Sequence, residues 1–568
     1  MSDIAEAPSP NVPEGAAGTG LDIRSLGQIL YLGGIGVAAL GALLWLLAQW
    51  NEGGAGEAVD ASTGTITLSL GGEPPQLDST RGTDAVSFNI LGHTMEGLLR
   101  YDPDNRLEAG VAERWEKTGD TMVTFHLRPN ARWSNGEPVT AHDFVFSWRK
   151  VLDPANASEY AFILYGLKNA EAINNGTMPV ESLEVHALDD RTLEVHLERP
   201  VPYFDKLVAF ATYNPISEAF YESREGRYAA DAEDLLYNGP FTISSWVHGA
   251  SIRLEKNPHY WDADNIRLNA IDYAYFTTDP NATINLFKDN KTALAGLVAE
   301  NLDDALQRRW KIKRFSDGAV FFMEFNHRED RLTRNYHLRK AIQAVNDSPE
   351  LVYRIIKLPG NLPGASLFPV WLKGVDGYFR QEYPLTDPLP DDELGRRHLA
   401  TAMAELALSE PPTLVMLIGD SPTAKKQAEY YQNLYKQKLG IDIRIDAQIF
   451  KQRLAKMTAG DFDIVMAGWG PDYDDPMTFA DLFASWNENN RGRFNNPELD
   501  EAVNVARSSS DPETRMDAMA RVQQILFDEA AIVVNYERGS VYVSHPRLKG
   551  IVRRAVGTDP DYTRAWIE

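Results

Sequence analysis

Helical and strand-like segments alternate along the second half of this sequence, and few folds accommodate that order. Helices are expected at residues 336–345, 391–408, 424–439 and 516–526. Short apolar runs typical of buried strands lie between or after them, at residues 413–418, 441–445, 464–466 and 531–535. Strands that alternate with helices form α/β folds, in which helices cover the faces of a sheet. The second half of the chain is therefore predicted to be an α/β domain.

The first half is richer in strands. Alternating or short apolar segments predict strands at residues 65–70, 121–127, 191–197, 238–243 and 252–255. Asn followed by Gly at residues 135–136 favours a tight hairpin turn. Thr140, with Asp143 three residues later, forms a capping box that begins a helix. His142 and Asp143 therefore have a structural explanation, and we do not interpret them as a catalytic pair.

Residues 26–50 contain no charged side chain and are mostly apolar, which is enough to span a bilayer. A cleaved signal peptide usually has a shorter apolar core, preceded by basic residues and followed closely by a cleavage site. Arg24 lies on the N-terminal flank, and the next basic residue is Arg81, so the N-terminus is expected in the cytoplasm. We expect residues 1–25 to be a disordered cytoplasmic tail, 26–50 a single transmembrane anchor of the inner membrane, and 51–64 a linker to a periplasmic domain.

Composition excludes several kinds of site. The formal net charge is −25, which argues against a nucleic-acid partner because such a partner needs a basic surface. The sequence has no cysteine, so disulfides, thiolate metal sites, cysteine nucleophiles and a lipid anchor on cysteine are all excluded.

Three carboxylates follow one of the expected strands. The apolar run at 464–466 leads into glycines and a proline at 468–471, and then to Asp472, Asp474 and Asp475. Carboxylates on a loop at a strand end can receive a cation from a ligand or a metal. The alternative is a turn in which the side chains bond their own backbone. A hydrolase with an acidic or metal cluster is a further alternative, but the run contains no His and no G-x-S-x-G motif accompanies it.

Another pair of side chains that could suggest metal binding or acid/base chemistry is His93 and Glu96, which lie one helical turn apart if residues 93–99 are helical. An exposed pair on a helix surface is the interpretation that we favour.

Several motifs, taken in order, resemble those of the oligopeptide-binding proteins of bacterial ABC importers, family 5 of the extracellular solute-binding proteins. They lie at residues 96–99, 125–128, 133–148, 201–204, 238–240, 257–262 and 467–476. The resemblance implies a two-lobed periplasmic-binding-protein fold, similar to type II with an extra domain. Lobe I would comprise residues 65–95, 220–325 and 540–568. The appended domain would be residues 96–219, and lobe II the α/β region 326–539.

The resemblance also implies a ligand site. In the family, an aspartate of the 469–476 motif accepts the α-amino group of the ligand, and here that residue is Asp472. An ammonium ion that loses its water in a closed cleft needs a fixed carboxylate. Trp469 would supply an apolar wall, with Gly468 and Tyr473 beside it, and Tyr160 would line the opposite lobe.

Residues 83–85 fall where relatives offer main-chain hydrogen bonds and an acidic side chain. Thr83 stands in place of that acid, but the neighbouring Asp84 could supply the charge, and Ala85 completes the segment. Strand-like main-chain bonds hold a peptide without reading its side chains. A disulfide of some relatives is impossible here, because Gly470 occupies the position of one of its cysteines.

Positions at which some relatives hold the carboxylate of the ligand with basic side chains are occupied here by Met457, Met466 and Ala424. This departure predicts weak discrimination for a free C-terminal carboxylate. Arg453, one helical turn before Met457, is the alternative base, and the two lysines at 425–426 are weaker candidates.

The function expected from the resemblance is capture of oligopeptides or peptide-like cations in the interlobe cleft and delivery to an ABC permease. No catalysis, cofactor, metal or nucleic acid is expected. The alternative, from another class, is a sensory or interaction module that uses the same cleft to signal through its membrane helix.

Overall fold

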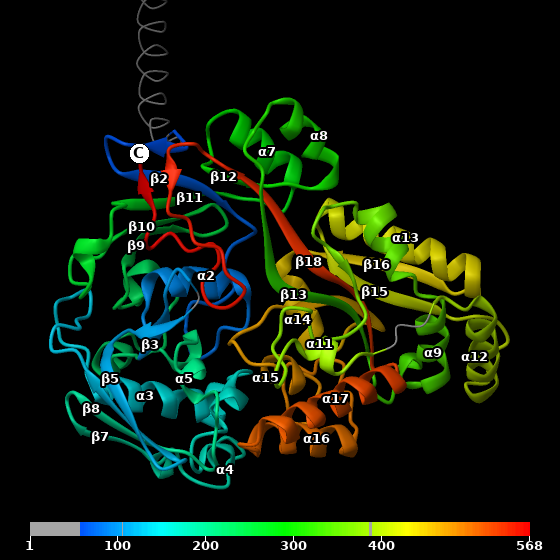
Figure 1. Ribbon diagram of the computed structural model, residues 1–568, viewed down its shortest axis with the longest axis horizontal. Helices are drawn as coiled ribbons and strands as arrows, with labels where there is room; N and C mark the ends of the chain where they lie inside the picture. The colour runs from blue at the N-terminus through cyan, green and yellow to red at the C-terminus, as the bar shows by residue number, and fades with distance from the viewer. Residues whose placement is uncertain (1–56, 105, 386–388) are drawn as a thin grey trace, which may run out of the picture. The chain divides into compact units, whose positions relative to one another are not determined.

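The computed structural model describes residues 57–104, 106–385 and 389–568, and residues Glu57–Glu568 form one compact unit (Figure 1). Three larger β-sheets and two two-stranded pairs organise these residues. The predicted tail and anchor, and the first part of the predicted linker, lie outside the described residues. Among the helices that the structure does describe, none combines the length and the apolar character needed to cross a membrane.

The first sheet has five strands in the order β1-β2-β11-β10-β9. Their bounds are Val59–Asp60, Thr65–Leu70, Ala270–Phe276, Ser251–Lys256 and Phe241–Val247. Strands β2 and β11 are parallel, and the other pairs are antiparallel. Residues 57–64, predicted as linker, are part of this sheet, because β1 pairs with β2 and buries Ala58 and Val59.

The second sheet has four antiparallel strands in the order β5-β6-β8-β7 and lies within the predicted appended domain. Their bounds are Ala112–Thr118, Met122–Leu127, Thr192–His196 and Val185–Asp189, and the small pair β3 (Leu99–Tyr101) and β4 (Leu107–Ala109) lies nearby in sequence. Helix α3 (Ala141–Leu152) packs against β7. The capping box of Thr140 and Asp143 is confirmed at its start, and Trp148 is fully buried.

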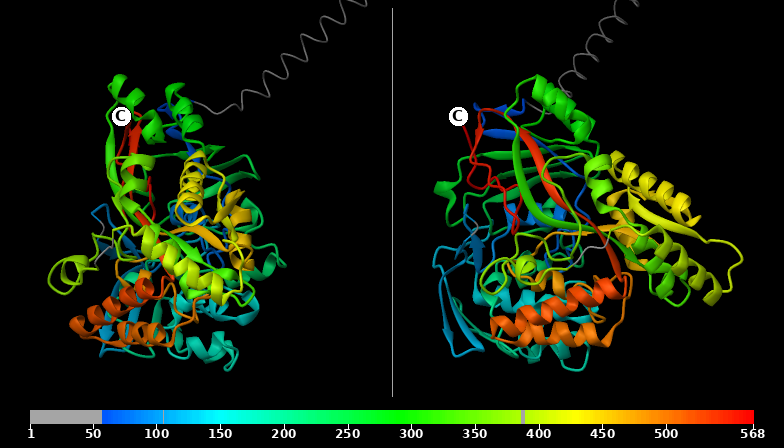
Figure 2. Two further views of the ribbon diagram at one scale, coloured as in Figure 1. Left: turned by 90° about the vertical axis from the view of Figure 1, so that its right-hand side faces the viewer. Right: turned by 45° about the vertical axis from the view of Figure 1, so that its right-hand side comes forward.

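The third sheet has seven strands in the order β12-β18-β13-β17-β15-β16, with β14 paired to β18. Their bounds are β12 Leu294–Gly296, β13 Lys313–Phe325, β14 Leu362–Pro363, β15 Thr413–Gly419, β16 Asp442–Gln448, β17 Ile464–Trp469 and β18 Ile532–Ser544. Strand β15 is parallel to β16 and β17, whereas β13 is antiparallel to β17 and β18. Figure 2 shows β13 and β18 as two long strands side by side.

The remaining helices are mostly associated with this third sheet. They are α7 Pro280–Lys288, α8 Ala299–Gln307, α9 Tyr336–Val345, α10 Ser348–Glu350, α11 Phe379–Glu382, α12 Asp392–Glu405, α13 Pro422–Leu439, α14 Phe450–Ala459, α15 Met477–Ala480, α16 Pro497–Ser508 and α17 Pro512–Asp528. The others are α2 Ala85–Thr94, α4 Ala170–Asn174, α5 Phe204–Leu207 and α6 Glu218–Ser223, and β19 (Leu548–Lys549) pairs with β20 (Trp566–Ile567). The predicted α/β alternation of the second half is confirmed.

The predicted border between the lobes differs from the sheet that the structure shows. Strands β12 and β13 were expected in lobe I, which was predicted to reach residue 325. Instead β13 is hydrogen-bonded to both β17 and β18 and is buried along its second half, so residues 294–325 belong with the α/β sheet. Strand β18 likewise continues to Ser544, beyond the expected border at residue 539.

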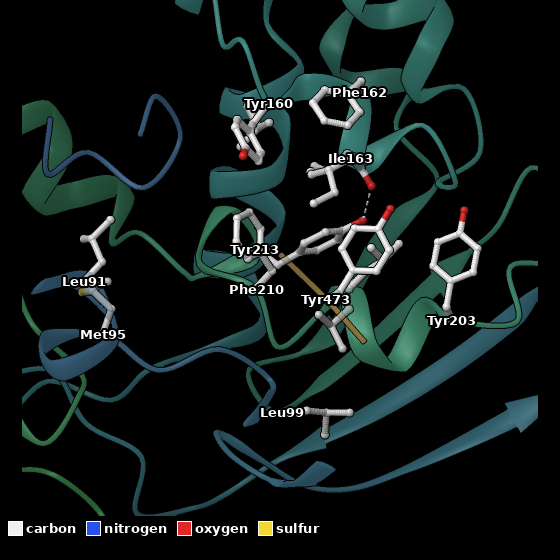
Figure 3. Packing of buried hydrophobic residues seen from close by; sticks show 14 of the residues in the cluster. Leu91, Met95, Leu99, Tyr160, Phe162, Ile163, Tyr203, Phe210, Tyr213 and Tyr473 are labelled. Atoms are coloured by element: carbon white, nitrogen blue, oxygen red, sulfur yellow. Dashed lines mark hydrogen bonds between the residues drawn. The ribbon is translucent and has the colours of Figure 1, made fainter. Parts of the chain in front are cut away.

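A buried cluster rich in aromatic side chains surrounds the turn that carries Tyr160 (Figure 3). The Tyr213 hydroxyl donates to the Ile163 carbonyl at 2.8 Å, and the Trp148 indole donates to the Tyr213 carbonyl at 3.0 Å. The Tyr160 ring stacks on Phe210, with ring centroids 5.6 Å apart. The Tyr160 ring is thus packed against the same cluster that these hydrogen bonds hold together.

Candidate ligand-binding cavity

A cavity of about 530 Å³ is lined by residues from the regions of all three large sheets and from the C-terminal segment. Eight of the nine residues predicted to contact a ligand line it: Thr83, Asp84, Ala85, Tyr160, Arg453, Gly468, Trp469 and Asp472. These residues are far apart in sequence, and the fold brings them together around one cavity.

Asp472 follows strand β17 at the point where the strand leaves the sheet. Buried Ile464 and Val465 hold the strand in the core, and Pro471 precedes the aspartate. The backbone N–H of Asp472 donates to the Thr478 hydroxyl at 3.0 Å, which anchors the loop. The Asp472 side chain lines the cavity from this anchored position.

The negative charge of the Asp472 carboxylate has little compensation from the described chain. Among the described residues, its hydrogen-bond donor is the Tyr160 hydroxyl, 3.2 Å from Oδ2, and no cation pairs with it. Burial raises the pKa of Asp472 well above its ordinary value of 3.8, the Tyr160 hydrogen bond lowers it, and the nearby Asp481 raises it further. A carboxylate held in this way has a strong preference for a cation that enters the cavity.

Aromatic side chains form the walls near Asp472. The Trp469 ring lies nearly parallel to Tyr160, with centroids 6.2 Å apart and planes 11° apart. Phe88 packs edge-on against Tyr160 from the side of helix α2. Trp469 Nε1 is buried and has no hydrogen-bond partner among the described residues. The site therefore offers apolar walls beside a single charged group.

Asp84 has a different role from the one that the sequence suggested. Its carboxylate caps helix α2, because Oδ1 accepts from the backbone N–H groups of Val86 and Ser87 at 3.0 and 2.9 Å. Oδ2 accepts from the Ser87 hydroxyl at 2.6 Å. Both oxygen atoms are thus occupied within the helix N-terminus, so Asp84 is not a free charge for a ligand.

Tyr473 does not line the cavity, contrary to expectation. Its ring stacks on Tyr203, with centroids 5.6 Å apart and planes 5° apart, and only 2% of the residue is exposed. The Tyr473 side chain therefore packs against Tyr203 and is not among the residues that line the cavity.

The two other carboxylates of the loop have separate partners. Asp475 is buried and forms a two-pronged ion pair with Arg515, with Oδ1 at 2.7 Å from Nη2. Asp474 is 44% exposed at its side chain and lies 3.9 Å from the Lys206 ammonium. The three aspartates do not form one cluster, and the described part of the chain contains no group of three or more His, Asp or Glu arranged to hold a metal.

Arg453 lines the cavity from helix α14. Its Nη1 donates to the Met466 carbonyl of β17 at 3.0 Å, and its Nε is buried without a partner among the described residues. Burial lowers the pKa of Arg453 to about 10, and the charge of Arg491 acts in the same direction. The guanidinium nevertheless stays protonated at neutral pH.

Three residues stand where some relatives have basic side chains, and only one of the three lines the cavity. Met457 lines it, whereas Met466 and Ala424 pack against the core of the α/β sheet. The two lysines at 425–426 are exposed on helix α13. The expected apolar environment for a ligand carboxylate therefore rests on Met457 alone.

Several cavity residues carried no local signal in the sequence. Arg491 follows α15 in a loop and binds Glu159 of the appended domain at 2.9 Å. The C-terminal segment contributes Arg554, Thr558 and Arg564. Their positions depend on contacts with residues hundreds of positions away, which spacing and periodicity along the chain do not reveal.

His93 and Glu96 are both buried, so the expectation of an exposed pair is wrong. Helix α2 ends at Thr94, and Glu96 accepts hydrogen bonds from Arg100 Nη1 at 3.1 Å and from the Tyr260 hydroxyl. His93 lies between the Asn89 carbonyl and the backbone N–H of Tyr562, which donates to its Nε2 at 3.1 Å. Both side chains join the N-terminal region to distant segments.

Comparison with known proteins gives one family. Residues 106–491 match the model of bacterial extracellular solute-binding proteins, family 5. The oligopeptide-binding protein OppA of Bacillus subtilis is 31% identical over 522 residues, which cover 89% of this chain and 94% of the relative.

Solved structures agree with this result. The substrate-binding domain of an oligopeptide ABC transporter from Bacillus anthracis has a TM-score of 0.85 and 34% identity, covering 89% of this chain and 99% of that one. OppA of Listeria monocytogenes bound to peptide has a TM-score of 0.84 and 30% identity over the same shares. The chain belongs to family 5 of the bacterial extracellular solute-binding proteins, a family of binding proteins and not of enzymes.

Proposed function

We propose that this protein binds peptides, or cations that resemble the amino end of a peptide, in the cavity around Asp472 and delivers them to an ABC permease. The observation that carries the proposal is the half-buried Asp472 carboxylate, which lines the cavity and has one neutral donor, Tyr160, and no cationic partner in the described chain. The names of its relatives support the proposal, since they include oligopeptide-binding proteins and the substrate-binding domain of an oligopeptide ABC transporter.

The geometry suits the terminal ammonium of a peptide. An ammonium that leaves water for a closed cavity must regain its lost interactions from fixed groups. Asp472 supplies the opposite charge, and the rings of Trp469 and Tyr160 exclude water around it. The Asp472 carboxylate follows β17, and its donor Tyr160 comes from the region between β6 and β7, so a movement of one region relative to the other would break this contact.

The direct test compares matched peptides that differ only at the amino end. Calorimetry with a tripeptide and its N-acetylated form should show at least about tenfold tighter binding of the free amine, a difference of about 1.4 kcal/mol or more. Equal affinities for the two forms would contradict the role of Asp472, and no binding of any peptide would contradict the proposed ligand class.

Binding should release a proton at pH values below the raised pKa of Asp472. Because burial raises the pKa of Asp472 above its ordinary 3.8, the carboxyl of the empty site is partly protonated below that raised value. An ammonium ligand binds the ionised form, so the affinity should be constant above the raised pKa and fall by up to about tenfold per pH unit below it. Calorimetry in two buffers with different ionisation enthalpies measures the proton release. A flat pH profile that Asp472→Ala shares with the wild type would contradict this prediction.

We also propose that residues 26–50 anchor the protein in the inner membrane, with the binding domain in the periplasm. All cavity-lining residues lie within the compact unit Glu57–Glu568. Deletion of residues 1–56 should therefore release the protein from membranes and leave its peptide affinity within about twofold of the full chain, as measured by fractionation and calorimetry.

A second deletion provides the control. Removal of residues 1–64 also removes β1, which pairs with β2 and buries Ala58 and Val59. That variant should lose thermal stability relative to the chain that begins at Glu57. A fragment 57–568 that stayed in the membrane fraction, or that could not bind, would contradict the anchor proposal.

A further inference from the structure

A short segment of this acidic chain is strongly basic. Residues 308–314 contain five Lys or Arg side chains and no acidic one, in a sequence whose formal net charge is −25. The segment joins the end of helix α8 to the start of strand β13. Opposite charges attract, so most surface cations of an acidic protein are expected to have acidic neighbours.

Most of the cations in this segment lack such neighbours. Arg308 is paired with Asp304, with Nε 3.0 Å from Oδ1, but the other four form no ion pair within the described part of the chain. Arg309 and Lys311 are exposed, whereas Lys313 is half-buried. Cations that lie together without acidic partners repel one another, and the surface that carries them attracts anions.

Lys313 connects this segment with a cation from the end of the chain. Its Nζ donates to the Ser544 hydroxyl of β18 at 3.0 Å. Burial lowers the pKa of Lys313, and the charges of Lys311 and Lys549 act in the same direction. The ammonium groups of these three lysines therefore lie close enough to act on one another.

A further cation lies beside Lys549. Arg547 Nε donates to the main-chain oxygen of Glu568 at 2.8 Å, and Lys549 Nζ is 2.9 Å from the side-chain carboxylate of the same residue. Glu568 therefore offsets only part of the positive charge. We call this group of cations the basic patch, and its members are Arg309, Lys311, Lys313, Arg547 and Lys549.

The basic patch lies at the end of the domain where the described chain begins. Burial lowers the pKa of His545, the charge of Arg547 acts in the same direction and that of Glu57 opposes it, so both charges lie near one side chain. The Ala58 backbone N–H donates to the Asn290 carbonyl, shortly before β12, at 2.8 Å. Figures 1 and 2 show β2, α7, α8 and the C-terminus at this same end.

This position matters because Glu57 is close in sequence to the proposed anchor. The anchor ends at residue 50, so only residues 51–56 separate it from Glu57. A chain covers at most about 3.5 Å per residue, which keeps Glu57 within about 25 Å of the end of the anchor. The face that carries Glu57 is therefore the face of the domain that the bilayer surface reaches first.

We propose that the basic patch binds the anionic headgroups of the inner membrane and holds the binding domain against the bilayer beside its anchor. This inference rests on the proposed anchor and adds an orientation of the domain to it. Lys and Arg side chains near an anionic lipid surface are attracted to it, and salt screens the attraction. Leu306, 57% exposed, and the half-buried Trp310 flank the first cations, and such side chains suit a membrane interface.

The experiment uses the full-length protein reconstituted in lipid vesicles. The chain has no cysteine, so Gln307→Cys or Ser510→Cys provides a single attachment point for a photo-crosslinker. Gln307 is exposed beside the basic patch, whereas Ser510 is exposed between α16 and α17, at the opposite end of the domain in Figure 1. The vesicles contain phosphatidylcholine alone or with phosphatidylglycerol, and mass spectrometry measures the lipid crosslinked at each site.

Anionic lipid is expected to raise crosslinking at Gln307→Cys by at least about fivefold over neutral vesicles. High salt should remove this increase, because it screens the charges on both surfaces. Ser510→Cys should give little crosslinking in either lipid. In the Gln307→Cys background, the combined changes Arg309→Gln, Lys311→Gln and Lys313→Gln should reduce crosslinking in anionic vesicles to about the level in neutral ones.

Two matched variants separate charge from other effects. Arg309→Lys combined with Lys311→Arg and Lys313→Arg retains the charge and should retain the increase. Removal of three other exposed cations in or beside β16, the strand at the edge of the sheet opposite β12, should also leave the increase unchanged. That control combines Lys425→Gln, Arg444→Gln and Lys451→Gln.

The outcomes separate this inference from the proposed functions. Equal crosslinking at Gln307→Cys in the two lipids, or an increase that survives the three Gln substitutions, would overturn the role of the basic patch and leave the anchor and peptide binding intact. A chain that alkaline carbonate extracts from the vesicles would overturn the anchor and this inference with it. A thermal melt identifies any variant that has lost its fold, and the charge-retaining variant then provides the comparison.

Discussion

Replacing Asp472 with alanine is expected to weaken the binding of a peptide with a free amino terminus by about 2–5 kcal/mol, because the ligand ammonium would be buried without its counter-charge. That loss corresponds to a factor of about thirty to several thousand in Kd. The unliganded variant should be at least as stable as the wild type, since the half-buried carboxylate has only the Tyr160 hydroxyl to compensate it. Calorimetry and a thermal melt measure the two effects.

Asp474→Ala is the matched control for this change. It removes the same charge from the same loop, but the Asp474 side chain is 44% exposed, does not line the cavity and lies 3.9 Å from Lys206. Its effect on affinity should stay within about 0.5 kcal/mol, the usual range for an exposed charge. Equal losses in the two variants would show that the ligand responds to the overall field of the loop and that Asp472 has no direct contact with it.

The position of Asp472 could be predicted because the pattern that places it is local. A short apolar run predicts the buried strand, and the glycines and the proline after it predict the exit from the sheet. The capping box of Thr140 and Asp143 was visible for the same reason, since its two bonds link residues three apart. In both cases the residues that determine the local structure lie close together in the sequence.

Neighbouring residues were harder to assign because the direction of a side chain depends on the sheet. Successive side chains of β17 point to opposite faces, so Met466 packs into the core of the α/β sheet while Ala467 and Trp469 line the cavity. Tyr473 stacks on Tyr203 of a region some 270 positions earlier. Sequence proximity to Asp472 therefore did not imply contact with the cavity.

The other features that the sequence did not predict depend on contacts between residues far apart in the chain. Strand β13 follows helix α8 in sequence, yet its hydrogen bonds go to β17 and β18. Residues 313–325 therefore belong to the α/β sheet, although the expected lobe border lay after them, at residue 325. Arg453 was identified only as a possible base. In the described part of the chain Arg453 has no ionic partner, only the Met466 carbonyl, and this depends on the folded arrangement of the cavity.

Breaking the buried ion pair between Asp475 and Arg515 is expected to reduce the free energy of unfolding by about 3–5 kcal/mol, because either single substitution leaves the other charge buried and unpaired. Both side chains are 8% exposed, and the Arg515 guanidinium meets the carboxylate at 2.7 and 3.3 Å. Asp475 also accepts from the Met477 backbone N–H at 3.0 Å, which ties the loop after Asp472 to helix α15. Denaturant unfolding of Asp475→Ala and Arg515→Met measures the loss.

The double variant decides whether the loss comes from an unpaired charge. Asp475→Ala combined with Arg515→Met should cost clearly less than the sum of the two single changes, since no uncompensated charge remains. The exposed pair of Arg521 on α17 and Glu498 on α16 is the control, and breaking it should cost at most about 1 kcal/mol. Additive losses at Asp475 and Arg515 would mean that the pair acts through packing. In every case Asp475→Ala should weaken peptide binding by the folded protein far less than Asp472→Ala does, because Asp475 supports the loop without lining the cavity.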